Sequence, residues 1–72
     1  MYKINSRYKI EGFTDNCPSS YMHNLLSMGF LPGVIFLIKK VAPLADPYQV
    51  EIKGTSVSMR KTELAFIEVT EV

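Results

Sequence analysis

Cys17 and His23 are the two residues of this chain whose side chains could support covalent catalysis. A cysteine becomes a strong nucleophile as a thiolate, which a neighbouring imidazole can generate when a third group orients that imidazole. The two residues lie six positions apart, on or beside one predicted helix, and helical periodicity places His23 on the solvent side. No third residue is placed to orient the imidazole. We therefore expect a small buried or half-buried thiol, a surface imidazole and no catalytic residue.

The remaining residue types argue against a tight metal site and against nucleotide binding. One His and one Cys cannot supply three or four nitrogen or sulfur ligands. Asp15, Asp46 and Glu63 could form only a weak oxygen site, and such carboxylates are usually just solvated. Gly29 and Gly33 are not followed by the Gly-Lys-Ser/Thr ending of a phosphate-binding loop. The sequence therefore predicts no metal ligand, no cofactor and no binding of GTP by this chain itself.

Size, charge and cysteine content predict one small cytoplasmic domain over residues 1–72. A chain of 72 residues buries about 60% of the surface that it exposes when unfolded. Eight basic and seven acidic residues are spread along the chain, so we expect no nucleic-acid partner. The single cysteine suits a reducing compartment. The N-terminal residues lack the apolar stretch of a signal peptide, and the longest apolar run, residues 34–38, is far below the ~20 residues that cross a bilayer. We expect membrane contact only through a partner.

Apolar spacing predicts five short strands and one helix. The helix is predicted over residues 21–28, because their apolar side chains cover one continuous arc. Pro18 suits its first turn, and the capping residue is one of three: Asn16, Ser19 or Ser20. The strands are predicted over residues 8–13, 34–41, 48–53, 56–60 and 65–69, with a helical turn at 61–64. Because residues 34–38 are apolar without alternation, we expect both faces of that segment to be covered.

Glycine and proline residues mark the corners between these elements. One corner follows the helix, where a glycine can end it and a Pro-Gly pair forces a turn. A second corner is a kinked hairpin loop, and Gly54 with Thr55 forms a two-residue turn after it. The residues predicted to shape the first two corners are Gly29, Pro32, Gly33, Pro43, Asp46 and Pro47.

Five short strands are too few for two packed sheets, but they suffice for a small, strongly bent barrel. We therefore predict a mainly β fold, a five-stranded partly closed barrel with one short α-helix between the first two strands. The predicted inward side chains are Ile10, Leu25, Val34, Phe36, Ile38, Val50, Ile52, Val57, Met59, Leu64 and Ile67.

Three ordered segments of the chain resemble the ferrous-iron transport protein A family, FeoA. They are residues 29–33, 41–47 and 60–65, within a colinear match that runs from Ile10 to Val69. The resemblance implies an SH3-like barrel and a cytoplasmic accessory protein of bacterial ferrous-iron uptake. It also implies a partner, the transporter FeoB, which carries a GTP-binding domain on its cytoplasmic side. A related SH3-like domain forms the C-terminal part of some metal-dependent transcription repressors.

Three functions follow from these observations. The first is a non-enzymatic interaction module that binds the cytoplasmic part of FeoB and modulates it. The alternative is a metal-responsive regulatory domain that acts with a transcription factor. The third is an SH3-type peptide reader, whose groove needs aromatic side chains. Because the chain has no Trp and its four Tyr are scattered along the sequence, we expect no capture of proline-rich ligands.

Apolar residues at turns and on the helix edge are the candidate partner contacts. Leu31 lies between the helix end and Pro32, and Leu44 lies at a hairpin tip between prolines. Phe30 is expected to close one end of the barrel instead. Met22 and Leu26, at one edge of the wide helical arc, could bind another protein or a second copy of the chain. A homo-oligomer, also through exposed strand edges, stays open at this point.

Overall fold

Antiparallel strands and short helical segments make up the part of the chain that the structure describes, residues 2–72 without the side chain of Ala45. In this computed structural model, those residues form eight elements: the five strands and two helical segments follow the predicted order, and a 3₁₀ turn that was not predicted lies in the hairpin loop. They are β1 (Arg7–Phe13), α1 (Ser19–Ser27), β2 (Ile35–Val41), the 3₁₀ turn η1 (Pro43–Ala45), β3 (Tyr48–Ile52), β4 (Thr55–Met59), α2 (Lys61–Leu64) and β5 (Ile67–Glu71).

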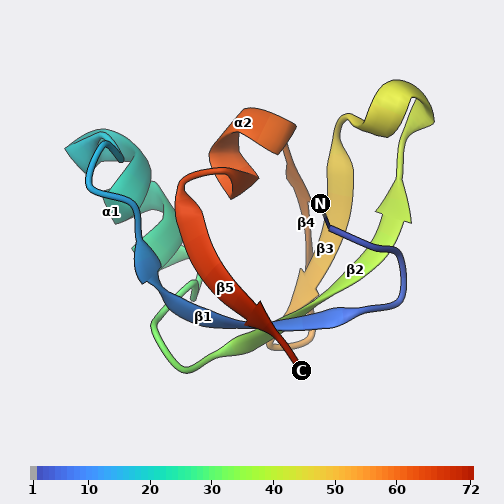
Figure 1. Cartoon of the computed structure of the whole chain (residues 1–72), viewed down its shortest axis with the longest axis horizontal. Helices are drawn as coiled ribbons and strands as arrows, with labels where there is room; N and C mark the ends of the chain where they lie inside the picture. The colour runs from blue at the N-terminus through green and yellow to red at the C-terminus, as the bar shows by residue number, and fades with distance from the viewer. Residues whose placement is uncertain (1) are drawn as a thin grey trace.

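The strands form one strongly bent antiparallel sheet in the order β4-β3-β2-β1-β5. Figure 1 shows the sheet curving around a concave side, with α2 across the top and α1 at one end. The pairing register shifts between Ile10 and Gly12 in β1 and between Ile38 and Lys40 in β2. An extra residue at such a bulge bends its strand and increases the twist, which curls the sheet. Within residues 2–72 β4 and β5 lie at opposite edges and do not pair, so the strongly bent sheet is not closed into a full barrel.

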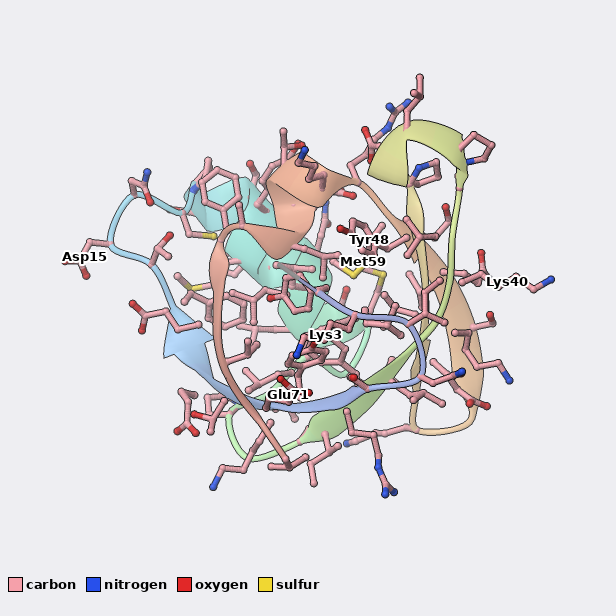
Figure 2. The ribbon with its side chains drawn as sticks, turned by 45° about the vertical axis from the view of Figure 1, so that its right-hand side comes forward. Lys3, Asp15, Lys40, Tyr48, Met59 and Glu71 are labelled. Carbon is pink, nitrogen blue, oxygen red and sulfur yellow. The ribbon has the colours of Figure 1, made fainter. Side chains whose placement is uncertain are left out.

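The core lies on the concave side of the sheet. It contains most of the predicted inward residues, and three aromatic residues join them: Tyr8, Phe30 and Tyr48. Val34 and Val57, predicted inward, are only half-buried against that core. Figure 2 shows Tyr48 beside Met59, its partner across β3 and β4, and both are buried. The buried set is Tyr8, Ile10, Leu25, Phe30, Phe36, Ile38, Tyr48, Val50, Ile52, Met59, Leu64 and Ile67.

The prediction that both faces of residues 34–38 are covered is wrong. Phe36 and Ile38 are buried, whereas Ile35 is 46% exposed and Leu37 is half-buried. The side chains alternate across the strand as in any sheet with one solvated face. The helix that could have covered the outer face lies at one end of the sheet instead (Figure 1).

One predicted turn and the predicted start of the last strand are displaced along the chain. The hairpin between β3 and β4 turns at Lys53 and Gly54, with φ of +50° and +77°, and not at Gly54 and Thr55. Positive φ at both central residues defines a type I′ turn, whose twist matches that of the flanking strands. The last strand begins at Ile67, because Phe66 still donates its backbone N–H to Glu63 in the turn that ends α2.

The start of α1 also differs from the prediction. Pro18 is the N-cap, and no side chain caps the helix. Asn16 lies two residues before the N-cap, and its Oδ1 accepts a hydrogen bond from the Thr14 hydroxyl at 2.7 Å. Both candidate serines lie inside the helix, which begins at Ser19 and ends one residue earlier than predicted, at Ser27.

Candidate functional site

Leu44, at the tip of the loop between β2 and β3, is the most exposed large apolar side chain that the structure describes. It is 97% exposed. Its backbone has φ +68° and ψ +19°, in the left-handed region that glycine and asparagine favour. Pro43 precedes it at the start of η1. The tip therefore presents a leucine in a strained backbone conformation and with almost no intramolecular cover.

Asp46 fastens this loop to the start of α2. Its Oδ1 accepts a hydrogen bond from the backbone N–H of Lys61 at 2.9 Å, and its Oδ2 lies 3.7 Å from Nη1 of Arg60. The carboxylate satisfies an N–H of the first helical turn that has no partner within the helix. Across the base of the loop, the N–H of Ala42 donates to the carbonyl of Pro47 at 3.0 Å, and the Asp46–Pro47 peptide bond is cis. The Ala42–Pro47 and Lys61–Asp46 hydrogen bonds thus hold the loop at its base and against α2.

The turn between α1 and β2 is built differently. Gly29 and Gly33 both have positive φ, +97° and +90°. Between them Phe30 is fully buried, as expected for a residue that closes the barrel end, while Leu31 is 40% exposed. Gly33 donates its N–H to the carbonyl of Ile10 at 2.7 Å, which joins the turn to β1. Pro32 is exposed at the corner.

The four predicted contact residues do not form one surface. Met22 and Leu26 are only half-buried on α1, and the more exposed apolar side chains nearby are Tyr21 and Met28. Figure 1 shows α1 and η1 at opposite ends of the longest axis, on which the molecule extends 29 Å. Met22 and Leu26 therefore belong to one end of the molecule and Leu44 to the other.

The residues considered for catalysis and metal binding are not assembled. His23 is exposed on α1, and Cys17 is half-buried in the preceding loop with its Sγ 3.6 Å from the carbonyl of Pro18. Figure 2 places Asp15 far from the loop of Asp46. Glu63 accepts a hydrogen bond from the backbone N–H of Arg60 at 2.8 Å. Within residues 2–72, no group of three His, Cys, Asp or Glu side chains is arranged to hold a metal ion.

Tyr2 is a residue that the sequence reasoning missed. Its ring packs on three other aromatic rings, and its hydroxyl donates to the carbonyl of Leu64 at 3.3 Å. Burial, followed by the nearby Tyr8 and Tyr48 hydroxyls, raises the pKa of Tyr2 to about 12. No periodicity could reveal this placement, because Tyr2 precedes the first strand and its contacts are distant in sequence.

A model of the FeoA domain matches residues 1–71 of this sequence. The chain belongs to the FeoA family. It is 34% identical to protein PA4359 from Pseudomonas aeruginosa over 97% of this chain and 93% of that one, with a TM-score of 0.77. It is 31% identical to iron(II) transport protein A from Clostridium thermocellum, with a TM-score of 0.89 over 99% of this chain and 43% of that one. The predicted SH3-like fold and the resemblance to FeoA are both confirmed.

The FeoA family consists of small domains associated with iron transport. The fold also extends to more distant proteins. ScaR, whose structure was solved with bound Cd²⁺, shares the fold at 17% identity, with a TM-score of 0.81 over 99% of this FeoA chain and 32% of ScaR. Among residues 2–72, no helix has both the length and the apolar character to cross a bilayer.

Proposed function

We propose that this FeoA chain is a cytoplasmic, non-enzymatic accessory protein of ferrous-iron uptake. It binds the cytoplasmic part of the FeoB transporter and modulates its transport or nucleotide cycle. Membership of the iron-transport-associated FeoA family supports the iron context. The single observation that carries the binding function is the exposed, strained Leu44 on a fastened loop.

Both the backbone conformation and the exposure of Leu44 are energetically unfavourable for a leucine. A side chain in the left-handed conformation costs roughly 1–2 kcal/mol relative to the usual backbone. With 97% of its surface exposed, the leucine recovers almost nothing by burial within the chain. Strain of this kind motivates a functional hypothesis. An apolar side chain that a rigid loop presents to solvent is suited to enter a pocket on a partner.

The α1 end of the molecule offers a second, separate contact region. Met28 and Leu31 are each 40% exposed there, beside the half-buried Met22 and Leu26. We assign this end a secondary role in partner binding or in self-association. Its side chains are partly covered by the chain itself, so each contributes less new apolar burial than Leu44.

Binding of the soluble cytoplasmic part of FeoB to the wild-type chain and two variants tests the proposal. Leu44→Asp removes the apolar tip and adds a charge, and we expect at least a tenfold loss of affinity, about 1.4 kcal/mol. Ile35→Asp is the matched control, because Ile35 is an exposed apolar residue on the outer face of β2. All three titrations are run with and without nucleotide and Fe²⁺. Full affinity of a folded Leu44→Asp variant would remove the loop tip from the interface.

The regulatory alternative rests on the fold that the chain shares with ScaR. In that alternative the chain would bind a transcription factor in a manner that depends on a transition metal. The two proposals differ in a direct Fe²⁺ titration of the isolated chain. Saturable Fe²⁺ binding would favour the regulatory alternative, whereas FeoB binding without metal would favour the transporter-associated function.

A further inference from the structure

The ring of Tyr2 covers an aromatic cluster on the concave side of the sheet. Its centroid lies 4.9 Å from that of Tyr8 and 6.1 Å from that of Tyr48, both edge-on, and 6.0 Å from that of Phe36. These three residues come from β1, β3 and β2, and none is more than 4% exposed. Edge-to-face and tilted ring pairs contribute beyond the area that they bury. We refer to Tyr8, Phe36 and Tyr48 as the aromatic socket.

A backbone carbonyl at the edge of the aromatic socket accepts a hydrogen bond from a phenol hydroxyl. The hydroxyl of Tyr2 donates to the carbonyl of Leu64, at the end of α2, over 3.3 Å. The backbone N–H of Lys3 donates to the hydroxyl of Tyr8 at 2.8 Å, so that hydroxyl is already engaged at the edge. Sites with apolar walls and a few fixed polar groups bind ligands whose polar atoms fall at those groups. A tyrosine side chain satisfies the Leu64 carbonyl, and a phenylalanine side chain does not.

Tyr2 reaches the socket on a segment that precedes the sheet. Figure 1 shows this segment crossing the concave side before it enters β1. The segment joins the sheet at Asn5, whose N–H donates to the carbonyl of Ile38 at 2.7 Å. Closer to Tyr2, the ion pair of Lys3 with Glu71 is 3.8 Å long, and its side chains are 71% and 47% exposed (Figure 2). Such exposed pairs contribute little. Opening of residues 2–4 breaks the Lys3–Tyr8 hydrogen bond and the contacts of Tyr2, but it breaks no strand pairing, so it costs less free energy than global unfolding.

The gathered tyrosines change the conclusion drawn from the sequence about peptide recognition. Although the four Tyr are scattered along the chain, Tyr2, Tyr8 and Tyr48 meet in space. Aromatic-lined sites are one of the recurring means by which small domains bind extended peptides. Here the chain's own residue lies in such a site.

We propose that the aromatic socket is a binding site for a tyrosine side chain, filled in the free chain by Tyr2 and open to a tyrosine on an extended segment of a partner when residues 2–4 swing away. The site is distinct from the η1 loop, so it stands or falls independently of the function proposed above. Tyr2 lowers the apparent affinity of the socket for any competing ligand. The smaller the fraction of molecules in which Tyr2 has left the socket, the weaker the apparent binding of that ligand.

Binding of p-cresol, the isolated side chain of tyrosine, tests this site by NMR. We expect Tyr2→Ala to bind p-cresol saturably, with shifts at the rings of Tyr8, Phe36 and Tyr48. Its affinity should exceed that of wild type by about tenfold or more, since the competing ring is gone. Tyr2→Phe is the matched control, because it refills the socket without the hydroxyl, so its affinity for p-cresol should lie between those of wild type and Tyr2→Ala. Toluene, which lacks the hydroxyl, should bind Tyr2→Ala more weakly than p-cresol does.

A second measurement applies if Tyr2→Ala does not fold. Wild-type protein labelled with 3-fluorotyrosine gives a ¹⁹F signal for Tyr2, which excess p-cresol should move to the position of a solvated tyrosine. A folded Tyr2→Ala variant that shows no saturable p-cresol binding would overturn the proposal. For an unfolded variant, a Tyr2 ¹⁹F signal that p-cresol leaves unmoved would overturn it equally.

Discussion

Tyr2 and Leu44 are two apolar side chains on irregular segments, and the fold places them in opposite environments. Tyr2 turns back onto the concave side, where three rings and a backbone carbonyl surround it. Leu44 projects from η1 with 97% of its surface exposed. The segment of Tyr2 is held mainly by side-chain contacts and by one backbone N–H on a tyrosine hydroxyl, whereas Asp46 ties the loop of Leu44 to the backbone of α2.

The contrast shows that exposure and rigidity are independent in this molecule. The half-buried ring of Tyr2 is carried by a segment without strand pairing, and the exposed leucine is carried by a loop that is hydrogen-bonded to α2. A ring on a weakly anchored segment can be exchanged for another ring, which suits a regulated site. A side chain on a backbone that is already held costs less conformational entropy to bind than one on a free segment, which suits a constitutive contact. The following predictions test this comparison through stability.

The largest difference is expected between the two alanine variants. Tyr2→Ala removes a half-buried ring from its cluster and should lower the free energy of unfolding by about 1–3 kcal/mol, less than the 3–5 kcal/mol typical of fully buried aromatic residues. Leu44→Ala removes an exposed side chain and should change it by no more than about 0.5 kcal/mol. Urea unfolding followed by circular dichroism measures both. An equal decrease in the free energy of unfolding in the two variants would contradict the different environments of Tyr2 and Leu44.

The decrease in the free energy of unfolding at alkaline pH should depend on the environment of Tyr2. Because its pKa is raised to about 12, from 10.0 in the unfolded chain, the native state holds a proton that the unfolded state releases between these values. The contribution of Tyr2 is therefore full below pH 10 and declines as pH rises to 12. Tyr2→Phe should lose less stability over this range. Lys3, Glu71, Tyr8 and Tyr48 are present in both proteins and serve as a common background. Parallel curves would contradict the buried position of the phenol.

A smaller effect than that of Tyr2→Ala, and of opposite sign, is expected from relieving the strain at Leu44. Asparagine tolerates the left-handed conformation, so Leu44→Asn should raise the free energy of unfolding by about 0.5–1 kcal/mol. The matched control is Leu31→Asn, at an exposed leucine for which no positive φ is recorded. Thermal melts under identical conditions compare the two. If Leu44→Asn is more stable than wild type but binds FeoB more weakly, the leucine contributes to binding at the expense of the free energy of unfolding.

The strand and helix order was predictable because it depends on local patterns. Alternation over residues 48–52 places Tyr48, Val50 and Ile52 on one buried face, as observed. The cap of α1 was not predicted correctly: Pro18, whose side chain has no hydrogen-bonding atom, takes the N-cap position, and the candidate serines lie inside the helix. The exposure of Ile35 depended on where α1 docks, which is a property of the whole fold.

The candidate site residues show the same division. The sequence indicated Leu44 as a residue at a hairpin tip, since prolines flank it closely. Its left-handed backbone and the role of Asp46 in holding the loop appeared only in the structure, because Asp46 bonds to a residue 15 positions away. Tyr2 gave no signal at all, since its partner carbonyl is 62 positions along the chain.

The sequence by itself determined the elements, their order, the buried faces of most strands and the resemblance to FeoA, because periodicity, glycine and proline act over a few residues. Only the tertiary structure decided which apolar side chains outside the strands are covered. Burial of such a side chain depends on surfaces that distant segments bring together. The bent sheet supplies that surface to Tyr2 and leaves Leu44 to the solvent.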